Sequence, residues 1–213
     1  AFNRPERRNA LTLAMWLELE AHFRRFAADA SLRGVVVTRA GEHLCAGADI
    51  SEFATNRSTA EQVRHYDEVV DRCEHAIAAL PKPVFAAIRG FCMGGGTGLA
   101  VACDFRIGAP DAKFAIPAGR LGIVYGMEET RHLLATVGMA NAKRILFGAE
   151  RFGAEEEEWR ENRFNQAATA VSSSPSWKGA WTRPWTSWSR RVGRRPSPWG
   201  PPPAARSGGG AGV

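Results

Sequence analysis

The chain has 213 residues and is 45% hydrophobic, so it is long enough for one α/β domain with a sizeable core. No apolar run approaches the roughly 18 residues of a membrane span, and no charged-then-apolar signal pattern opens the chain, which favours a soluble cytoplasmic protein without membrane partners. The net charge of +6 favours nucleic-acid or membrane-surface binding, but much of the excess lies near the C-terminus.

The composition changes abruptly after residue 154. Six of the seven tryptophans and seven of the twelve prolines lie beyond that point, where aliphatic residues nearly vanish. We therefore expect two parts, a domain over residues 1–154 and a disordered or aberrant tail over residues 155–213. Our preferred hypothesis for the tail is a frameshift near residues 155–158 in a GC-rich coding sequence, and no lasting periodicity contradicts it. The alternative is an aromatic and basic tail that binds nucleic acid or a membrane surface.

The first predicted element is a helix that follows Asn9, which we expect to act as its N-cap. The residues on its apolar face are Met15, Leu19, Phe23 and Phe26. The β-branched run 35–38 then predicts a short buried strand. The loop that follows it, G-E-H-L-C-A-G-A-D-I at 41–50, is a candidate for function, because α/β proteins place sites on such loops. The chain opens on A-F-N-R-P without an initiator Met, and we expect the domain to be truncated at its N-terminus.

A second helix is predicted from residue 58 to residue 80. The sequence Ser58-Thr59-Ala60-Glu61 has the spacing of a capping box, and Pro81 ends the pattern. The apolar positions recur at intervals of three and four: Val63, Tyr66, Val70, Cys73, Ile77 and Leu80. A second buried strand is expected over residues 84–88.

The remaining elements follow a glycine stretch at residues 94–98. We expect helical turns at 99–103, strands at 104–107 and 113–116, and two helices, 127–137 and 139–147, that separate at Gly138. Strands that alternate with helices in this order predict an α/β fold with a largely parallel sheet and covering helices.

The four cysteines are expected to be buried thiols in a reducing compartment. They are Cys45, Cys73, Cys92 and Cys103, each in an apolar setting and none in a C-x-x-C pair. The cysteines and histidines never cluster at ligand spacing, so we expect no metal site.

The glycine stretch has a chemical interpretation and a structural one. A strand that ends in consecutive glycines before a helix exposes backbone N–H groups at the helix N-terminus, where a phosphate or a developing oxyanion is stabilised. The sequence G-G-G-T-G-L lacks both the dinucleotide pattern G-x-G-x-x-G and the G-K-[ST] end of a P-loop. The alternative is that the glycines only allow a helix and a strand to pack closely.

Four motifs in order make residues 1 to about 154 resemble the crotonase superfamily of enoyl-CoA hydratases and isomerases. They are N-R-P-E-R-R-N-A-L at 3–11, H-L-C-A-G-A-D-I at 43–50, F-A-A-I-R-G-F-C-M-G-G-G-T-G-L-A-V-A-C-D-F at 85–105 and K-F-A-I-P-A-G-R-L-G at 113–122. The resemblance implies a ββα superhelix core with mostly parallel strands and an irregular C-terminal region. It also implies an acyl-CoA thioester as the binding partner, coenzyme A as part of the substrate, no permanently bound cofactor, and a homotrimer or dimer of trimers if the C-terminal region were intact.

The same resemblance assigns the site residues. The backbone N–H groups of Ala48 and Gly95 are expected to bind the thioester oxygen and stabilise an enolate. The substrate-binding residues that it implies are Arg7, Arg8, Ala46, Asp49, Ile50 and Gly94. For Arg7 and for Arg8, a solvated surface position is an equally good explanation. For Asp49, the alternative is that it orders its loop through backbone hydrogen bonds.

Two positions depart from the family pattern. Hydratases of this family use two glutamates for proton transfer, and here Gly98 and Ala118 occupy their places. We therefore expect poor hydratase activity. An isomerase needs only one base, for which Glu128 and Glu129 are candidates, although both are also explained as acids in the first turn of a helix.

Three further side chains lie near the expected site. Tyr125 is a candidate hydrogen-bond donor near the acyl group, while His43 and His132 have no identified partner and are expected to be structural. The leading hypothesis is an acyl-CoA enzyme that stabilises an enolate. The alternatives are an inactive or truncated acyl-CoA-binding member of the family and, less favoured, a nucleic-acid binder that uses its basic tail.

Overall fold

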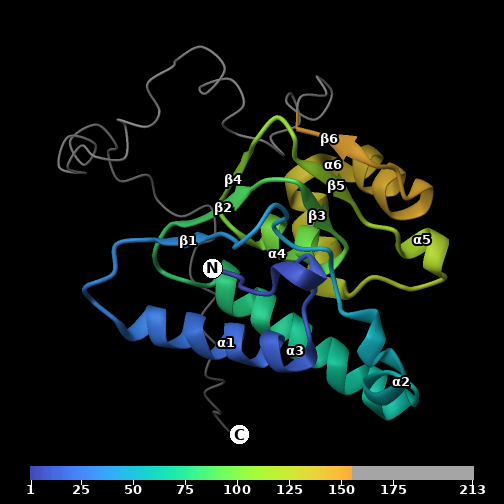
Figure 1. The fold of residues 1–213 in the computed structure, drawn as a ribbon, viewed down its shortest axis with the longest axis horizontal. Helices are drawn as coiled ribbons and strands as arrows, with labels where there is room; N and C mark the ends of the chain where they lie inside the picture. Colours follow the sequence, from blue (N-terminus) through green and yellow to red (C-terminus); the bar gives the residue numbers. More distant parts are fainter. Residues whose placement is uncertain (155–213) are drawn as a thin grey trace, which may run out of the picture. The chain divides into compact units, whose positions relative to one another are not determined.

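The computed structural model describes residues 1–154, shown in colour in Figure 1. The helices are η1 Pro5–Arg7, α1 Leu13–Ala28, η2 Ile50–Glu52, α2 Phe53–Asn56, α3 Ala60–Ala78, α4 Gly95–Ala102, α5 Ala118–Leu121 and α6 Met127–Gly148. The strands are β1 Val35–Val37, β2 Val84–Ile88, β3 Phe91–Met93, β4 Phe105–Gly108, β5 Lys113–Ala115 and β6 Phe152–Gly153. The predicted tail, and with it the frameshift hypothesis, lies outside the described residues.

The strands form two small sheets, of order β1-β2-β4 and β3-β5-β6. Every pair in the first sheet is parallel, with Val35 opposite Val84 and Phe85 opposite Phe105. In the second sheet β3 and β5 are parallel, whereas β5 and β6 are antiparallel. The predicted α/β fold with mostly parallel strands is therefore confirmed.

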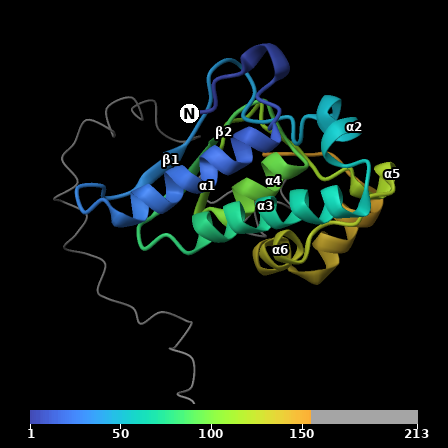
Figure 2. The same ribbon diagram turned by 90° about the horizontal axis from the view of Figure 1, so that it is seen from below.

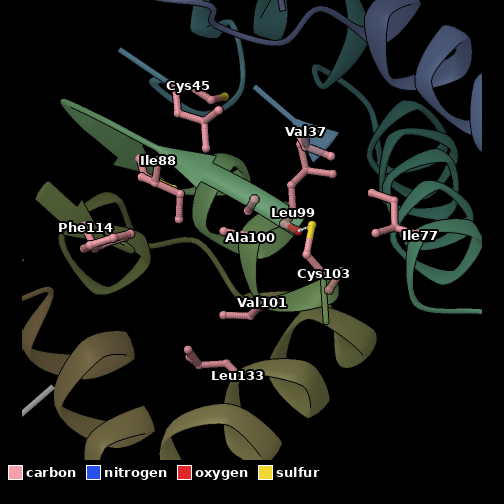
Figure 3. Packing of buried hydrophobic residues seen from close by; sticks show 14 of the residues in the cluster. Val37, Cys45, Ile77, Ile88, Leu99, Ala100, Val101, Cys103, Phe114 and Leu133 are labelled. Atoms are coloured by element: carbon pink, nitrogen blue, oxygen red, sulfur yellow. Dashed lines mark hydrogen bonds between the residues drawn. The ribbon is translucent and has the colours of Figure 1, made fainter. Parts of the chain in front are cut away.

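Helix α4 lies at the centre of the packing. It contacts α3 and α6, while α1 packs against α3 (Figure 2). Its residues are small enough for this position, and all of them from Gly96 to Ala102 are buried. Figure 3 shows the α4 side chains Leu99 and Val101 among apolar residues of the strands and of α6, including Ile88 and Leu133. The glycine stretch therefore leads into the middle of the core.

The N-terminus of α1 differs from the prediction. Thr12, not Asn9, is the N-cap, and its hydroxyl accepts from the N–H of Met15. Asn9 is fully buried with φ 55°; its Oδ1 accepts from the N–H of Arg4, and its Nδ2 donates to the carbonyls of Ala40 and His43. Asn9 thus links two segments that are far apart in the sequence, which helix-capping rules alone do not predict.

The capping box of α3 is shifted by one residue from the predicted one. Thr59 accepts from the N–H of Gln62, and the Gln62 side chain accepts from the N–H of Thr59, so the Ser58 and Glu61 assignment was wrong. The predicted separation at Gly138 is confirmed, because Gly138 has a non-helical φ of 76° and kinks α6.

All four cysteines are buried and free, as predicted, while the reducing compartment stays a prediction. Cys45 and Cys92 form an isolated parallel β-bridge through their backbones, which joins the 41–50 loop to β3. Within the part of the chain that the structure describes, no helix combines the length and the hydrophobicity that crossing a bilayer requires.

Candidate functional site

The turn between β3 and α4 brings two glycine segments together. Gly94 adopts φ 50°, and its N–H donates to the carbonyl of Ala115 over 2.8 Å. Gly47 adopts φ 97°, and a Cβ on it would stand 3.0 Å from the carbonyl oxygen of Met93. The close approach of the 45–48 and 93–95 segments therefore leaves no room for a side chain at Gly47, whereas at Gly94 it is the positive φ that disfavours one.

Gly95 and Gly96 are also required by packing. A Cβ on Gly95 would stand 2.9 Å from Cζ2 of Trp16, and a Cβ on Gly96 would stand 2.9 Å from the carbonyl oxygen of Cys45. The close-packing interpretation of the glycine stretch is therefore correct for these two positions. Close packing does not exclude a chemical role, because it restricts a Cβ at each of these glycines and leaves the backbone N–H unaffected.

Two backbone donors are left open beside these glycines. Next to Ala48, Gly47 accepts from the N–H of Leu11 and Asp49 donates to the carbonyl of Leu11, but the N–H of Ala48 takes no part in this bridge. The N–H of Gly95 begins α4 and has no acceptor within the helix. Among residues 1–154, neither N–H has a hydrogen-bond acceptor. Both residues line one pocket, so both donors are available to a ligand.

The pocket has a volume of about 150 Å³ and is largely apolar. Its apolar lining includes Trp16, Phe53, Val70, Ile116, Leu121 and Val124. Its titratable lining residues are Arg57, Tyr66, Asp67, Asp71, Tyr125 and Glu129. An apolar pocket with a few convergent polar groups is the usual form of a small-molecule site.

Three of the six predicted substrate-binding residues, Ala46, Ile50 and Gly94, line this pocket. Asp49 does not. Its carboxylate accepts from the N–H and the hydroxyl of Ser51 and pairs with Arg4 Nη1 at 2.5 Å, and these hydrogen bonds lower the pKa of Asp49 to about 2. This geometry is that of a residue that orders its loop.

Arg7 and Arg8 are exposed and lie outside the pocket lining. The carbonyl of Arg8 accepts from the N–H of Ala46 over 3.0 Å, which ties the arginine turn to the edge of the pocket. The guanidinium of Arg8 lies over the ring of Phe91, 5.6 Å from its centroid. The backbone of Arg8 thus adjoins the pocket edge, while its guanidinium is held over Phe91 by a cation–π contact.

The two positions that depart from the family pattern have different surroundings. Ala118 lines the pocket. Gly98 is buried in α4, and a Cβ there would collide with Oε1 of Glu74 and stand 3.1 Å from Oε1 of Glu129. The space beside Gly98 is therefore filled by carboxyl groups from α3 and α6.

Glu74 is fully buried on α3. Within residues 1–154 neither of its carboxyl oxygens has a hydrogen-bond partner, although Nδ1 of His132 lies 3.8 Å from Oε2. Burial raises the pKa of Glu74 well above its usual value, and the charges of Asp71 and Glu128 raise it further. A buried carboxyl without hydrogen bonds is expensive to maintain, which makes Glu74 unusual in this core.

Glu129 lies in the first turn of α6 and is only 9% exposed. Its Oε2 accepts from the N–H of Gly126 over 3.0 Å, so it caps the helix as its position in the sequence indicates. It also lines the pocket, and burial followed by the charge of Glu74 raises its pKa to about 8. Glu129 is therefore the first-turn acid that the sequence predicts, and its carboxyl also lies in the pocket lining.

Tyr125 supports the glycine turn. Its hydroxyl donates to the carbonyl of Gly94 over 2.8 Å, and the same carbonyl accepts from the N–H groups of Thr97 and Gly98. The carbonyl of Gly94 and the N–H of Gly95 belong to one peptide unit. Tyr125 therefore helps to hold the plane of the peptide that carries one of the two open donors.

Sequence reasoning missed Glu74, Trp16 and Arg57. Cys73 lies on the apolar face of α3 and Glu74 follows it. A carboxyl next to that face was the one signal in the sequence that could have indicated Glu74. Trp16 donates through its indole N–H to the hydroxyl of Tyr66, and Arg57 lies 4.8 Å from the centroid of the Tyr66 ring. These contacts join α1, α2 and α3, so nothing local in the sequence indicates them.

The two histidines have packing partners. Nδ1 of His43 accepts from the N–H of Phe91, and its ring stacks on the Phe91 ring with centroids 4.3 Å apart. His132 is buried, and Nε2 lies 3.0 Å from Nη2 of Arg131. Among the described residues, no group of three or more His, Cys, Asp or Glu side chains has the arrangement of a metal site.

Comparisons with known proteins agree with this architecture. Residues 1–160 match the family described as "Enoyl-CoA hydratase/isomerase". The chain is 38% identical over 155 residues to a crotonyl-CoA hydratase of Syntrophomonas wolfei, covering 72% of this chain and 59% of that protein. It is 34% identical over 164 residues to a peroxisomal Delta(3,5)-Delta(2,4)-dienoyl-CoA isomerase of Arabidopsis thaliana, again with 72% and 59% coverage.

The fold has similar counterparts among solved structures. An enoyl-CoA hydratase/carnithine racemase from Magnetospirillum magneticum superposes with a TM-score of 0.73 at 35% identity, covering 88% of this chain and 73% of that one. The chain thus spans about 59% of the length of the curated relatives named above. It has the crotonase fold, and it belongs to the enoyl-CoA hydratase/isomerase family.

Proposed function

We propose that this protein binds an acyl-CoA thioester and stabilises its enolate through the backbone N–H groups of Ala48 and Gly95. One observation carries the proposal: within residues 1–154 both donors lack an acceptor, and both line the same apolar pocket. A thioester oxygen that enters the pocket supplies the missing acceptor.

The physical basis is electrostatic. Negative charge moves onto the thioester oxygen as a proton leaves the adjacent carbon, and fixed N–H dipoles stabilise that charge without reorganising. Gly95 adds the favourable N-terminal end of α4. Removal of one such donor typically costs about a hundred- to a thousandfold in rate.

We place the rest of the substrate along the edge of the pocket. Ala46 and Ile50 line it, the carbonyl of Arg8 accepts from the N–H of Ala46, and the guanidinium groups of Arg7 and Arg8 would suit the phosphates of coenzyme A. Asp49 would act indirectly, because its bonds to Ser51 and Arg4 order the loop that carries Ala48. Coenzyme A would belong to the substrate, and no permanently bound cofactor is required.

The reaction class is constrained by Gly98 and Ala118. Neither residue transfers a proton, so efficient addition of water to an enoyl-CoA is not expected. Because the named relatives include an isomerase as well as a hydratase, an isomerisation that needs a single base is the better candidate. The same two residues favour a second candidate, an acyl-CoA-binding protein without turnover.

The proposal is tested by calorimetric binding of two ligands to the full chain: butyryl-CoA and S-butyl-CoA, its thioether analogue without a carbonyl. We expect the thioester to bind at least about tenfold more tightly, equal to about 1.4 kcal/mol. Equal affinities would contradict the role of the two donors, and no binding of either ligand would contradict acyl-CoA binding altogether. Turnover of crotonyl-CoA in parallel separates a hydratase from the other candidates.

The remaining expectations stay predictions. The homotrimer or dimer of trimers and the cytoplasmic location follow from the resemblance and the composition alone. The nucleic-acid alternative depends on residues 155–213, outside the described part of the chain.

A further inference from the structure

The carboxyl groups of Glu74 and Glu129 converge beside Gly98. They come from α3 and α6, and Oε1 of each approaches the position where a Cβ on Gly98 would stand. This arrangement depends on the absence of a side chain at residue 98. Two carboxyl groups therefore lie beside the position at which the family pattern has a glutamate and this chain has Gly98.

We propose that Glu129 is the catalytic residue that transfers the substrate proton in this pocket, and that Glu74 is a positioning residue that packs behind it in the space left by Gly98. The inference rests on the proposed function, since it assumes that an acyl-CoA thioester occupies the pocket. It places a base in the pocket although Gly98 and Ala118 replace the two family glutamates.

The location of Glu129 carries the first step of the argument. It lines the same pocket as Ala48 and Gly95, so it shares a ligand with the two open donors. Oε2 is held by the N–H of Gly126, while Oε1 is directed toward Gly98. The carboxyl is therefore fixed at one oxygen by its own helix, as an effective base needs to be.

The environment of Glu74 carries the second step. It is fully buried, it is not part of the pocket lining, and within the described residues neither of its carboxyl oxygens accepts a hydrogen bond. It therefore has no direct access to a substrate. Its contact with the space beside Gly98 places it against Glu129, so it acts by fixing the position and the charge of that group.

The proton transfer balances without another reactant. The Glu129 carboxylate takes the proton from C2 of a 3-enoyl thioester, and the C–H electron pair forms the enolate whose oxygen is bound by Ala48 and Gly95. The resulting carboxylic acid returns the proton to C4 as the electrons move back, and the double bond shifts from C3–C4 to C2–C3. The carboxylate is regenerated.

Several groups set the charge of Glu129. On α3 it faces Glu74, Asp71, Asp67 and Tyr66, and on its own side of the pocket it faces Tyr125 and His132. Burial is the largest cause of its raised pKa of about 8, and the charge of Glu74 is the second. The ionised fraction of Glu129, and with it the rate of proton abstraction, increases as pH rises through that value.

The decisive experiment follows deuterium uptake at C2 of butyryl-CoA in D₂O by mass spectrometry, using the full chain. We expect exchange by the parent protein, with a rate that rises through about pH 8. Glu129→Gln should lose at least about a hundredfold of this rate, because its amide takes no proton, while it still caps Gly126 and binds butyryl-CoA normally. Glu129→Asp should retain part of the rate.

Glu68→Gln is the matched control. Glu68 is an exposed carboxyl on α3 and does not line the pocket, so the exchange rate should stay within about twofold of the parent. Unchanged exchange in Glu129→Gln would overturn the proposal. Binding without exchange in the parent protein would also overturn it and leave acyl-CoA binding intact, whereas absence of binding would overturn the proposed function.

Glu74→Gln tests the positioning role separately. It keeps the size of the side chain but removes its charge, so the midpoint of the exchange profile should fall by about half a pH unit or more while the plateau rate remains. A purely structural role predicts no shift in the midpoint. An unchanged midpoint would therefore contradict the assignment of Glu74.

Discussion

Glu74 occupies the space that a side chain at Gly98 would need. Oε1 of Glu74 lies too close to the position of a Cβ on Gly98 for both to be present without a shift. A family glutamate at residue 98 is therefore incompatible with Glu74 in its observed position. The absence of a side chain at residue 98 and the buried position of the Glu74 carboxyl therefore depend on each other.

This relationship predicts strong coupling between the two positions. Gly98→Ala should lower the free energy of unfolding by about 1–3 kcal/mol through overpacking, and the loss should shrink by at least about 1 kcal/mol when Glu74→Ala is also present. Urea denaturation of the parent, the two single variants and the double variant measures the coupling.

Gly148→Ala is a suitable control for that cycle. A Cβ on Gly148 would find its nearest neighbour at an ordinary 3.4 Å, so this substitution should be neutral or stabilising by up to about 1 kcal/mol. Purely additive effects of Gly98→Ala and Glu74→Ala would show that the two side chains do not compete for space.

The raised pKa of Glu129 predicts how stability depends on pH. An acid whose pKa rises from 4.5 in the unfolded chain to about 8 in the folded one contributes stability that is complete below 4.5 and lost as pH rises through 8. Glu129→Gln has no charge to bury, so its unfolding free energy should fall less over this range. Urea denaturation across the range measures it, and parallel curves for parent and variant would contradict the raised pKa.

Tyr125 provides a test of the glycine turn. Tyr125→Phe removes the hydrogen bond to the carbonyl of Gly94, which belongs to the same peptide unit as the N–H of Gly95. A net hydrogen bond is worth about 0.5–1.5 kcal/mol, so butyryl-CoA binding should weaken roughly 2- to 12-fold. Binding of S-butyl-CoA, which has no carbonyl, should change less. An equal loss for both ligands would indicate a general packing defect instead.

Asn9 predicts a structural effect away from the pocket. Asn9→Ala removes the partners of one N–H and two carbonyls that are partly buried, and we expect a loss of about 2–3 kcal/mol in unfolding free energy. Asn9→Gly loses the same bonds but tolerates φ 55°, so it should be about 1 kcal/mol more stable than Asn9→Ala. Thermal and urea unfolding of both variants check this. Equal stabilities would contradict a contribution from the backbone conformation.

Elements that depend on local patterns are predictable from the amino-acid sequence alone. The apolar periodicity of α1 and α3, the strand 84–88 and the separation of helices at Gly138 all reflect interactions within a few residues, and the structure confirms them. Four motifs in order, including the stretch 85–105, also indicated the family.

Contacts between polar groups from distant segments become visible only in the folded protein. Asn9 has the residue type of an N-cap, but its partners are Ala40 and His43, which lie across a loop. Gly98 looked like a missing carboxylate in the sequence, whereas folding brings Glu74 and Glu129 to its side from two other helices. The reason is physical: periodicity reports which face of a helix is buried, but the burial of a particular carboxyl, and hence its pKa, depends on neighbours that are distant in the sequence.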